Sequence, residues 1–511
     1  MAEKDLKKLH KELKNIDQIE QAVHETGRPV AKYGIVLLFM AIVLVISFFQ
    51  GGDSVNSTFV IVAGLLGAYM ALNIGANDVA NNIGPAVGSK ALTMVGALII
   101  AAVFEAAGAI LAGGDVVKTI SKGIIAPELM PDTQTFILAM MSALLAAAVW
   151  VNVATFIGAP VSTTHAVVGG VMGGGIAATG FDAVSWPTMG TIAASWIISP
   201  VLGGVIAALF LAFIKHQIIF KEDRVTAAKR WVPILVSIMA AVFSMYLMKK
   251  GLKKIWKPDW WVVLAIGAGI LAASVAITRP VVAKAAEGIE NRRKAVSELF
   301  TIPLICSAAL LSFAHGANDV ANAIGPLAAI VGAASTGEIA TTVHVPLWVM
   351  GIGAAGISAG LLLFGPKLVR MVGEKITKLD RMRAFCVALS AAITVIVASA
   401  LGLPVSSTHI AVGAVFGVGF YREFLTNKKR AQKQAEREAA FQESIVLKSH
   451  EEDIDNPTPK EIKKAEKAKR RKLVRRQHLM TIVSAWLITV PLAALLAAAL
   501  FLSLNGFLGE G

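Results

Sequence analysis

The sequence predicts an all-α polytopic membrane protein, an inverted-repeat secondary transporter with discontinuous helices and hairpins. The first observation is composition. Of 511 residues, 56% are hydrophobic and 16% are charged, which is typical of a chain with many membrane spans. The second observation is a polar motif that occurs twice within apolar segments. Gly75-Ala-Asn-Asp-Val-Ala-Asn-Asn-Ile-Gly-Pro85 recurs as Gly316-Ala-Asn-Asp-Val-Ala-Asn-Ala-Ile-Gly-Pro326, with ten of eleven positions identical.

A second pair of related segments follows the first pair. Gly158-Ala-Pro-Val-Ser-Thr-Thr-His165 recurs as Gly402-Leu-Pro-Val-Ser-Ser-Thr-His409. Each half of the chain therefore contributes two polar segments that Gly and Pro interrupt. Such segments in corresponding positions of two halves indicate a binding site near the middle of the membrane.

Residues 1–57 are expected to form a basic cytoplasmic leader and an additional N-terminal span. Apolar residues recur at helical spacing within 1–32, which predicts a short amphipathic helix. The first span is 33–50, and the loop 51–57 has no Lys or Arg. The positive-inside rule therefore places the N-terminus in the cytoplasm.

The first transport repeat is expected at 58–215. Residues 58–88 make one crossing, and Gly75, Gly84 and Pro85 predict that its helix is interrupted. The Gly-rich segment 160–178 is either a shortened crossing or half of a re-entrant hairpin. The remaining spans of this repeat are predicted at 91–112, 135–158 and 186–214.

Residues 216–298 link the halves through two spans, 231–248 and 260–278, and basic loops. The turn between these spans holds five lysines between Lys249 and Lys257. The topology places this turn outside, in conflict with the positive-inside rule.

The second transport repeat begins on the opposite side of the membrane from the first, which makes the repeat inverted. Its core covers 299–421, a basic cytoplasmic insert follows at 422–478, and 479–511 contains the last span. The core spans are predicted at 299–333, 342–365, 383–403 and 404–420. About thirteen crossings result, with the C-terminus outside, in an integral cytoplasmic (inner) membrane protein.

Buried Asp78 and Asp319 need a cation or a proton to offset their desolvation. Asn81 and Asn322 lie three residues later and share a helix face with them. Their oxygens, with carbonyls that a helix break frees, suit a hard cation. Interhelical hydrogen bonding is the alternative. Further candidates for coupling or orienting roles are Asn77, Asn318 and the isolated Glu105.

The two Pro-Val-Ser-[Ser/Thr]-Thr-His segments have the chemistry of helix starts. Free amides and hydroxyls at a helix N-terminus bind oxyanions, although ordinary capping is the alternative. Neither motif contains Arg or Lys, so cations held at Asp78 and Asp319 could supply positive charge and couple anion to cation. His165 and His409 are either buried core histidines or residues that bind a ligand or orient the motif.

These motifs, with Phe104-Glu105 and Lys118-Thr-Ile-Ser-Lys-Gly-Ile124, resemble the inorganic phosphate transporter family. The resemblance covers roughly 58–215 and 299–504 and is greatest to sodium-coupled members; the position of the insert suggests a prokaryotic protein. It implies symport of inorganic phosphate with sodium by alternating access. It implies sodium ligands from Asp78, Asn81, Asp319 and Asn322. The implied phosphate contacts are Ser162, Thr163, Thr164, Ser406, Ser407 and Thr408.

Other functions receive less support. The net charge of +14 lies mostly in loops between spans, which argues against nucleic-acid binding, and two cysteines give no disulfide framework. An intramembrane hydrolase using Ser162, His165 and Asp78 would need one site, whereas both copies are intact. We therefore expect no enzyme and no cofactor beyond transported sodium. Proton-coupled phosphate transport and sulfate transport stay open as alternatives, as does a homodimer in the lipid bilayer.

Overall fold

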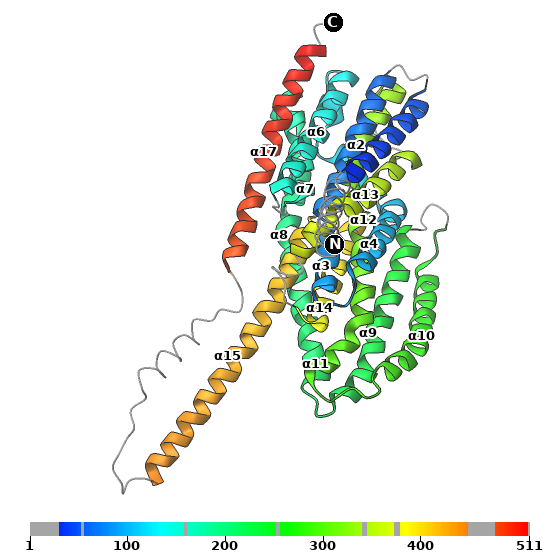
Figure 1. Ribbon diagram of the computed structural model, residues 1–511. Coiled ribbons are helices and arrows are strands. Elements are labelled where there is room, and N and C mark those ends of the chain that lie inside the picture. Colours follow the sequence, from blue (N-terminus) through cyan, green and yellow to red (C-terminus); the bar gives the residue numbers. More distant parts are fainter. Residues whose placement is uncertain are drawn as a thin grey trace, which may run out of the picture.

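The computed structural model describes residues 30–52, 56–157, 161–251, 256–339, 345–371, 379–447 and 476–508, and these residues are almost entirely helical (Figure 1). No strand occurs in these ranges, apart from an isolated bridge between Ile125 and Val184. Eleven of the described helices are long and apolar enough to cross a membrane. The chain is therefore an integral membrane protein of helices, as the sequence predicts. The amphipathic helix predicted within 1–32 and residues 448–475 of the insert lie outside the described residues.

The first Asn-Asp motif interrupts a helix, as predicted, but at a different residue. A helix at Val30–Gly51 precedes α2 (Ser57–Asn77), and α3 (Ala80–Gly88) continues through Pro85. Between α2 and α3, the amide of Asn81 donates to the carbonyl oxygen of Asp78 at 3.1 Å, which is the tighter bond of a 3₁₀ turn. The break therefore places Asp78 at the junction, whereas Gly75, Gly84 and Pro85 lie within helices.

The second copy of the motif lies in an unbroken helix. It belongs to α12 (Thr301–Thr336), which follows two short helices, α11 (Arg293–Val296) and η6 (Ser297–Phe300). Next comes α13 (Leu347–Met371). In the first half, α4 (Met94–Ala112) has the position that α13 has in the second half. Four short helices occur later in the first half. These are α5 (Gly114–Lys118), η1 (Thr119–Gly123), η2 (Pro127–Leu129) and, later in the chain, η3 (Phe181–Ala183).

Each Ser-Thr-His motif begins the second leg of a helical hairpin. The first hairpin is α6 (Thr133–Ile157) and α7 (Thr163–Thr179), and the second is α14 (Arg381–Ala400) and α15 (Ser407–Leu447). The hydroxyl of Thr164 donates to the carbonyl oxygen of Val405 at 3.1 Å, so the two hairpin tips meet. Residues 161–165 and 404–409 are buried, and α7 and α15 therefore start inside the protein. These two helices are the predicted spans missing from the eleven helices that could cross a membrane.

The last helix of each half packs against the hairpin of the other half. Helix α8 (Trp186–Ile214) lies along α15, and α17 (Arg476–Leu508) lies along α7 (Figure 1). Glycines permit both close approaches, because a methyl group at Gly417 would overlap the Gly204 carbonyl and one at Gly173 would overlap the Ala494 carbonyl. These glycines hold equivalent positions, eight residues after the motif histidines His165 and His409. The two halves are thus interlocked.

Two helices connect the halves, and short extensions follow α8 and the first of these two. Helix α8 continues into η4 (Lys215–Ile219), and α9 (Arg224–Tyr246) continues into η5 (Leu247–Gly251) before α10 (Trp260–Ala285). Lys250 Nζ lies 2.7 Å from Asp115 Oδ2 and donates to the Ala400 carbonyl, and Lys249 lies over the ring of Trp260. These two lysines of the basic turn therefore make contacts within the protein, which reduces their value as a guide to topology.

Candidate functional site

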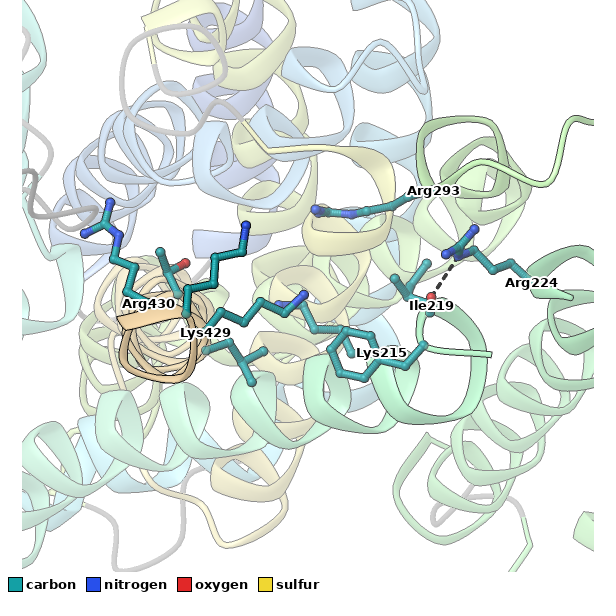
Figure 2. Close-up of a pocket in the computed structure, with 10 residues that line it drawn as sticks. Lys215, Ile219, Arg224, Arg293, Lys429 and Arg430 are labelled. Carbon is teal, nitrogen blue, oxygen red and sulfur yellow. Dashed lines mark hydrogen bonds between the residues drawn. The ribbon is translucent and has the colours of Figure 1, made fainter. Parts of the chain in front are cut away.

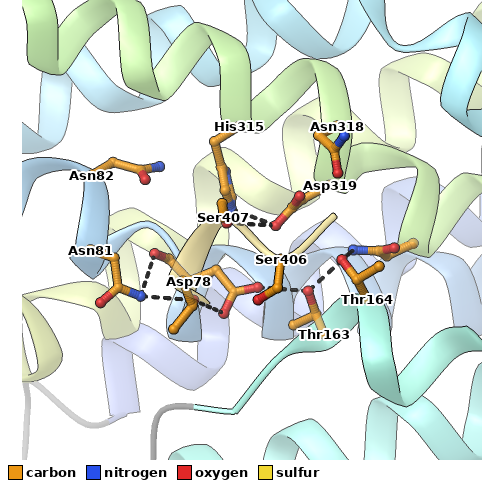
Figure 3. A network of polar contacts seen from close by, with 12 residues as sticks. Asp78, Asn81, Asn82, Thr163, Thr164, His315, Asn318, Asp319, Ser406 and Ser407 are labelled. Carbon is orange, nitrogen blue, oxygen red and sulfur yellow. Dashed lines mark hydrogen bonds and ion pairs between the residues drawn. The ribbon is translucent and has the colours of Figure 1, made fainter. Parts of the chain in front are cut away.

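The two Asn-Asp motifs and the two hairpin tips meet in one buried polar network (Figure 3). Asp78 comes from the break between α2 and α3, and Asp319 from the middle of α12. The side chains of Asp78 and Asp319 are each 1% exposed. Charged groups at this depth are costly unless they are paired, so the network is the first candidate for function.

Each aspartate accepts a hydrogen bond from the hairpin of its own half. Thr163 Oγ1 donates to Asp78 Oδ2 at 2.6 Å, and Ser407 Oγ donates to Asp319 Oδ2 at 3.1 Å. Thr163 and Ser407 occupy equivalent positions in the two Ser-Thr-His motifs. The same contact therefore occurs twice, once in each repeat.

Each asparagine donates to the hairpin of the other half. Asn81 Nδ2 lies 2.9 Å from Thr408 Oγ1, and Asn322 Nδ2 lies 3.1 Å from Thr164 Oγ1. Thr164 and Thr408 are again equivalent positions. From the sequence, each asparagine shares a helix face with the aspartate of its own motif. The structure shows in addition that each asparagine bonds the hairpin of the opposite repeat.

Several acceptor oxygens in the network have no hydrogen donor. Asp319 Oδ1 and Asn322 Oδ1 are buried without a hydrogen-bond partner in the described part of the chain. Buried polar atoms are nearly always satisfied, and carboxylate and amide oxygens are ligands that hard cations prefer. These oxygens therefore fit the cation site that the sequence predicts.

Ser162 and Ser406 cap the helices that begin at the hairpin tips. Ser162 Oγ accepts from the amide of His165 at 3.2 Å, and Ser406 Oγ accepts from the amide of His409 at 3.3 Å. Capping was the alternative to an anion contact, but a hydroxyl that accepts one hydrogen bond still has a proton to donate. The positive ends of the helix dipoles of α7 and α15 also point into the network, which favours a negative ligand there.

Asn77 and Asn318 donate hydrogen bonds to the first helices of the two hairpins, α6 and α14. Asn77 Nδ2 donates to Thr155 Oγ1 of α6 at 2.8 Å. Asn318 Nδ2 donates to Ser399 Oγ of α14 at 3.0 Å. The two contacts are equivalent, and each ties an Asn-Asp motif to the hairpin of its own half.

His165 and His409 lie behind the hairpin tips and against each other. Their ring centroids are 4.6 Å apart, and the His165 ring is 3.8 Å from that of Trp196. Trp196 Nε1 donates to the Pro404 carbonyl, which ties α8 to the second tip. Of the two roles that the sequence leaves open, this packing favours orienting the motif.

One chain of polar contacts breaks the symmetry between the repeats. Asn82 Nδ2 donates to Glu105 Oε1 at 2.8 Å, and Glu105 Oε2 lies 2.6 Å from His315 Nδ1. His315 Nε2 lies 2.9 Å from Asp319 Oδ2. The first repeat has Ile74 where the second has His315, and the second has Ala323 where the first has Asn82. The residues without a counterpart are thus bonded to one another and, through His315, to the central site.

Sequence reasoning named Glu105 but missed His315 and Asn82. A signal was present, because His315 lies four residues before Asp319 on the same helix face and replaces an isoleucine of the first repeat. The ligand atoms of Asp78, His315 and Asp319 lie within 4.8 Å of one another, an arrangement that could hold a metal ion. Two carboxylates this close cannot both be ionised without positive charge, which a protonated His315 or bound cations could supply.

The glycines of both Asn-Asp motifs permit the helix crossings that close the site. A methyl group at Gly75 would overlap the Ile357 carbonyl of α13, and one at Gly316 would overlap the Glu105 carbonyl of α4. The helix that carries Glu105 therefore crosses α12 next to His315. In this structure both glycines serve close packing.

Comparison with known proteins gives consistent similarities. The model of the "Phosphate transporter family" matches residues 74–497. A "Putative phosphate permease" of Helicobacter pylori is 46% identical over 97% of this chain and 99% of its own length. A protein of the same description from Pyrococcus abyssi is 38% identical over 70% of this chain and 88% of its own length.

A solved structure described as "The sodium-dependent phosphate transporter" has a similar fold. It superposes with a TM-score of 0.76 at 35% sequence identity, covering 88% of this chain and 100% of that one. The similarity therefore extends over most of the chain.

Proposed function

Since this chain belongs to the phosphate transporter family, we propose that it is a symporter that imports inorganic phosphate with sodium ions by alternating access. Membership of that family makes the chain a transporter and not an enzyme. The observation that carries the finer proposal is the doubled contact pattern at the hairpin tips, in which each aspartate and each asparagine bonds a motif hydroxyl. The sodium-dependent relative supports sodium as the coupling ion.

The proposed cation ligands are the oxygens of Asp78, Asn81, Asp319 and Asn322. The asparagine amides donate to hydroxyls, which leaves their carbonyl oxygens as acceptors. An ion bound between an aspartate and its hairpin hydroxyl would hold the tip against the Asn-Asp motif. Sodium would then assemble the site before phosphate enters.

The proposed phosphate ligands are the hydroxyls and free amides at the starts of α7 and α15. The hydroxyls belong to Ser162, Thr163, Thr164, Ser406, Ser407 and Thr408. All six side chains are buried, so their hydrogen bonds to a tetrahedral anion would form away from water. The motifs lack Arg and Lys, so bound sodium would supply the positive charge that phosphate needs, and binding of the two would be mutually favourable.

A specific observation also favours proton coupling as a second candidate. His315 lies between the carboxylates of Glu105 and Asp319, a geometry suited to holding and passing a proton. In the leading proposal, His315 instead keeps Asp319 oriented and offsets part of the negative charge. We place the protein in the cytoplasmic (inner) membrane, with the N-terminus inside and the C-terminus outside, because the basic loops are then cytoplasmic.

Uptake into vesicles with imposed gradients tests the proposal. Purified full-length protein should accumulate labelled phosphate when an inward sodium gradient is imposed at equal pH on both sides. Accumulation driven by an inward proton gradient without sodium would favour the second candidate. Equilibration without accumulation under either gradient would reject coupled transport, and preference for sulfate would reject phosphate as the substrate.

A further inference from the structure

A basic pocket lies where α8 ends and α15 leaves the helical bundle (Figure 2). Its volume is about 500 Å³, and it is formed by η4, the start of α9, α11 and α15. None of its lining residues is acidic. Six of them are cationic: Lys215, Arg224, Arg293, Lys429, Arg430 and Lys433.

Aromatic rings and backbone carbonyls hold several of these cations in place. Lys215 Nζ lies 5.4 Å from the ring centroid of Tyr421, and Lys429 Nζ lies 5.6 Å from that of Phe220. Arg224 donates to the carbonyl of Ile219 at 2.9 Å. These contacts orient the side chains without neutralising their charge.

Arg293 is paired with a carboxylate outside the pocket. Its guanidinium lies 3.1 Å from Asp380 Oδ2. Burial raises the pKa of the Asp380 carboxyl, but the hydrogen bond and charge of Arg383 outweigh this and lower that pKa overall. Figure 2 shows Lys429 and Arg293 extending toward each other from opposite sides of the pocket. Like charges brought together in this way repel one another, and an anion between them would reverse the sign of the interaction.

The pocket lies at the level where membrane spans end. The span Trp186–Ile219 stops at the pocket, and the spans Arg224–Gly251 and Arg293–Thr336 begin there. Phospholipid phosphates occupy this level, and basic pockets between helices on the cytoplasmic side are suited to anionic headgroups.

An apolar groove leads from the membrane interior to the pocket. The groove lies between α8, α15 and α17, has a volume of about 1110 Å³, and is lined by side chains that include Trp196, Phe416 and Phe420. Gly204 and Ala208 of α8 line the groove, and Lys215 and Ile219 continue the same helix face into the pocket. Tyr421 also lines the groove, and its ring lies beside Lys215. The groove and the pocket are therefore neighbouring parts of one surface.

We propose that an anionic phospholipid binds here, with its phosphate among Lys215, Lys429 and Arg293 and its acyl chains in the groove. The charge of the pocket matches the headgroup, and the apolar lining of the groove matches the chains. A soluble phosphate compound could occupy the pocket, but it would leave the adjoining groove unexplained. The basic pocket shares no lining residue with the central network, although His165 borders the groove, and the proposal does not depend on the transported ion.

Quenching of Trp196 by brominated lipids tests the proposal, because Trp196 lines the groove. The full-length protein is reconstituted in neutral phosphatidylcholine with a small fraction of brominated phosphatidylglycerol or, for comparison, brominated phosphatidylcholine. The difference between the protein and its Trp196→Phe variant isolates this tryptophan from the others. We expect phosphatidylglycerol to quench Trp196 at much lower fractions than phosphatidylcholine.

The double variant Lys429→Gln/Lys433→Gln removes two pocket charges at exposed positions of α15. We expect roughly thirtyfold weaker lipid binding, which corresponds to about 2 kcal/mol for two lysines at an anionic headgroup. Lys428→Gln is the matched control, since this exposed lysine is their neighbour on α15 but does not line the pocket. It should bind phosphatidylglycerol as the parent does.

Three results would overturn the proposal. Equal quenching by both brominated lipids would exclude selection of the headgroup. A phosphatidylglycerol preference that survives in the double variant would place the headgroup elsewhere. Pyrophosphate binding in neutral vesicles that needs Lys429 and Lys433, without any phosphatidylglycerol preference, would show a site for soluble anions.

Discussion

At the scale of single residues, the central question is how two buried carboxylates coexist. Asp78 and Asp319 receive hydrogen bonds from Thr163 and Ser407, but neutral donors offset only part of the cost of burying two charges. His315 contacts Asp319 and can carry one positive charge. If both aspartates and Glu105 are ionised, two further positive charges are needed for neutrality, and cations bound at the proposed site could supply them.

The aspartates should therefore set the sodium dependence of uptake. Asp78→Asn and Asp319→Asn keep the shape of the side chain and remove its charge, so sodium binding should weaken and phosphate accumulation should be lost. Uptake in vesicles is measured as a function of sodium concentration, with expression and thermal melting as controls for folding. If both variants retain the parental sodium dependence, the carboxylates are structural and Glu105 becomes the first candidate for coupling.

The capping serines allow the anion contact to be separated from helix stability. Replacing a capping serine with glycine costs a few tenths of a kcal/mol, whereas replacing it with alanine costs about 1 kcal/mol. Ser162→Gly and Ser406→Gly should leave thermal stability nearly unchanged. If each hydroxyl donates to phosphate, each variant should weaken phosphate binding by about 1–3 kcal/mol. Unchanged apparent affinity for phosphate in both well-folded variants would assign these serines to capping alone.

At the scale of elements, the site depends on how the hairpins are clamped. Helix α15 carries Ser407 and Thr408 at its start and lies against α8 through Gly413 and Gly417. Helix α7 makes the equivalent contact with α17 through Gly169 and Gly173. A change in either helix crossing should therefore move a hairpin tip relative to its aspartate.

Gly417→Ala tests this clamp. The added methyl group would overlap the Gly204 carbonyl of α8, and overpacking of this kind costs about 1–3 kcal/mol. We expect a lower melting temperature and a weaker apparent affinity for phosphate. The control is Gly190→Ala in α8, where a methyl group meets nothing within 4 Å. If the two variants have the same melting temperature and the same apparent affinity for phosphate, α8 and α15 can move apart without affecting the site.

The sequence predicted most spans because apolar length is a local property. The bounds predicted for 186–214 agree with α8, and those for 135–158 and 91–112 differ from the structure by a few residues. The helix break was predicted from Gly and Pro but lies at Asp78, because a tightened turn, and not a missing backbone donor, causes it. The unbroken path of α12 through the second motif could not be predicted, since the two motifs are almost identical in sequence.

Apart from Glu105, the candidate site was predicted where it is repeated. The doubled motifs predicted Asp78, Asp319 and the hydroxyl residues, and the structure brings them together. His315 occurs once, so it had to be found as a difference between the repeats, and its contact with Glu105 of another helix could not be predicted. The packing of α8 against the second hairpin and of α17 against the first could not be predicted either, because it joins distant parts of the chain.

At the scale of the whole molecule, the paired contacts indicate a pseudo-two-fold relation between the halves. The pair Asp78–Thr163 corresponds to Asp319–Ser407, and Asn81–Thr408 corresponds to Asn322–Thr164. An axis in the membrane plane would make the halves inverted, which is the arrangement that lets one central site face either side in turn. The loop after α4 and the loop after α13 should then lie on opposite sides of the membrane.

Cysteine labelling tests this arrangement in a background that lacks Cys306 and Cys386. Lys118→Cys and Lys367→Cys introduce thiols at exposed positions after α4 and near the end of α13. An impermeant reagent added to intact cells should label residue 118, whereas residue 367 should react only in inverted vesicles. Arg292→Cys, in the exposed basic loop before α11, is the cytoplasmic reference and should behave as residue 367 does. If residues 118 and 367 react from the same side, the halves are parallel, and the contacts at the hairpin tips would need an axis along the membrane normal.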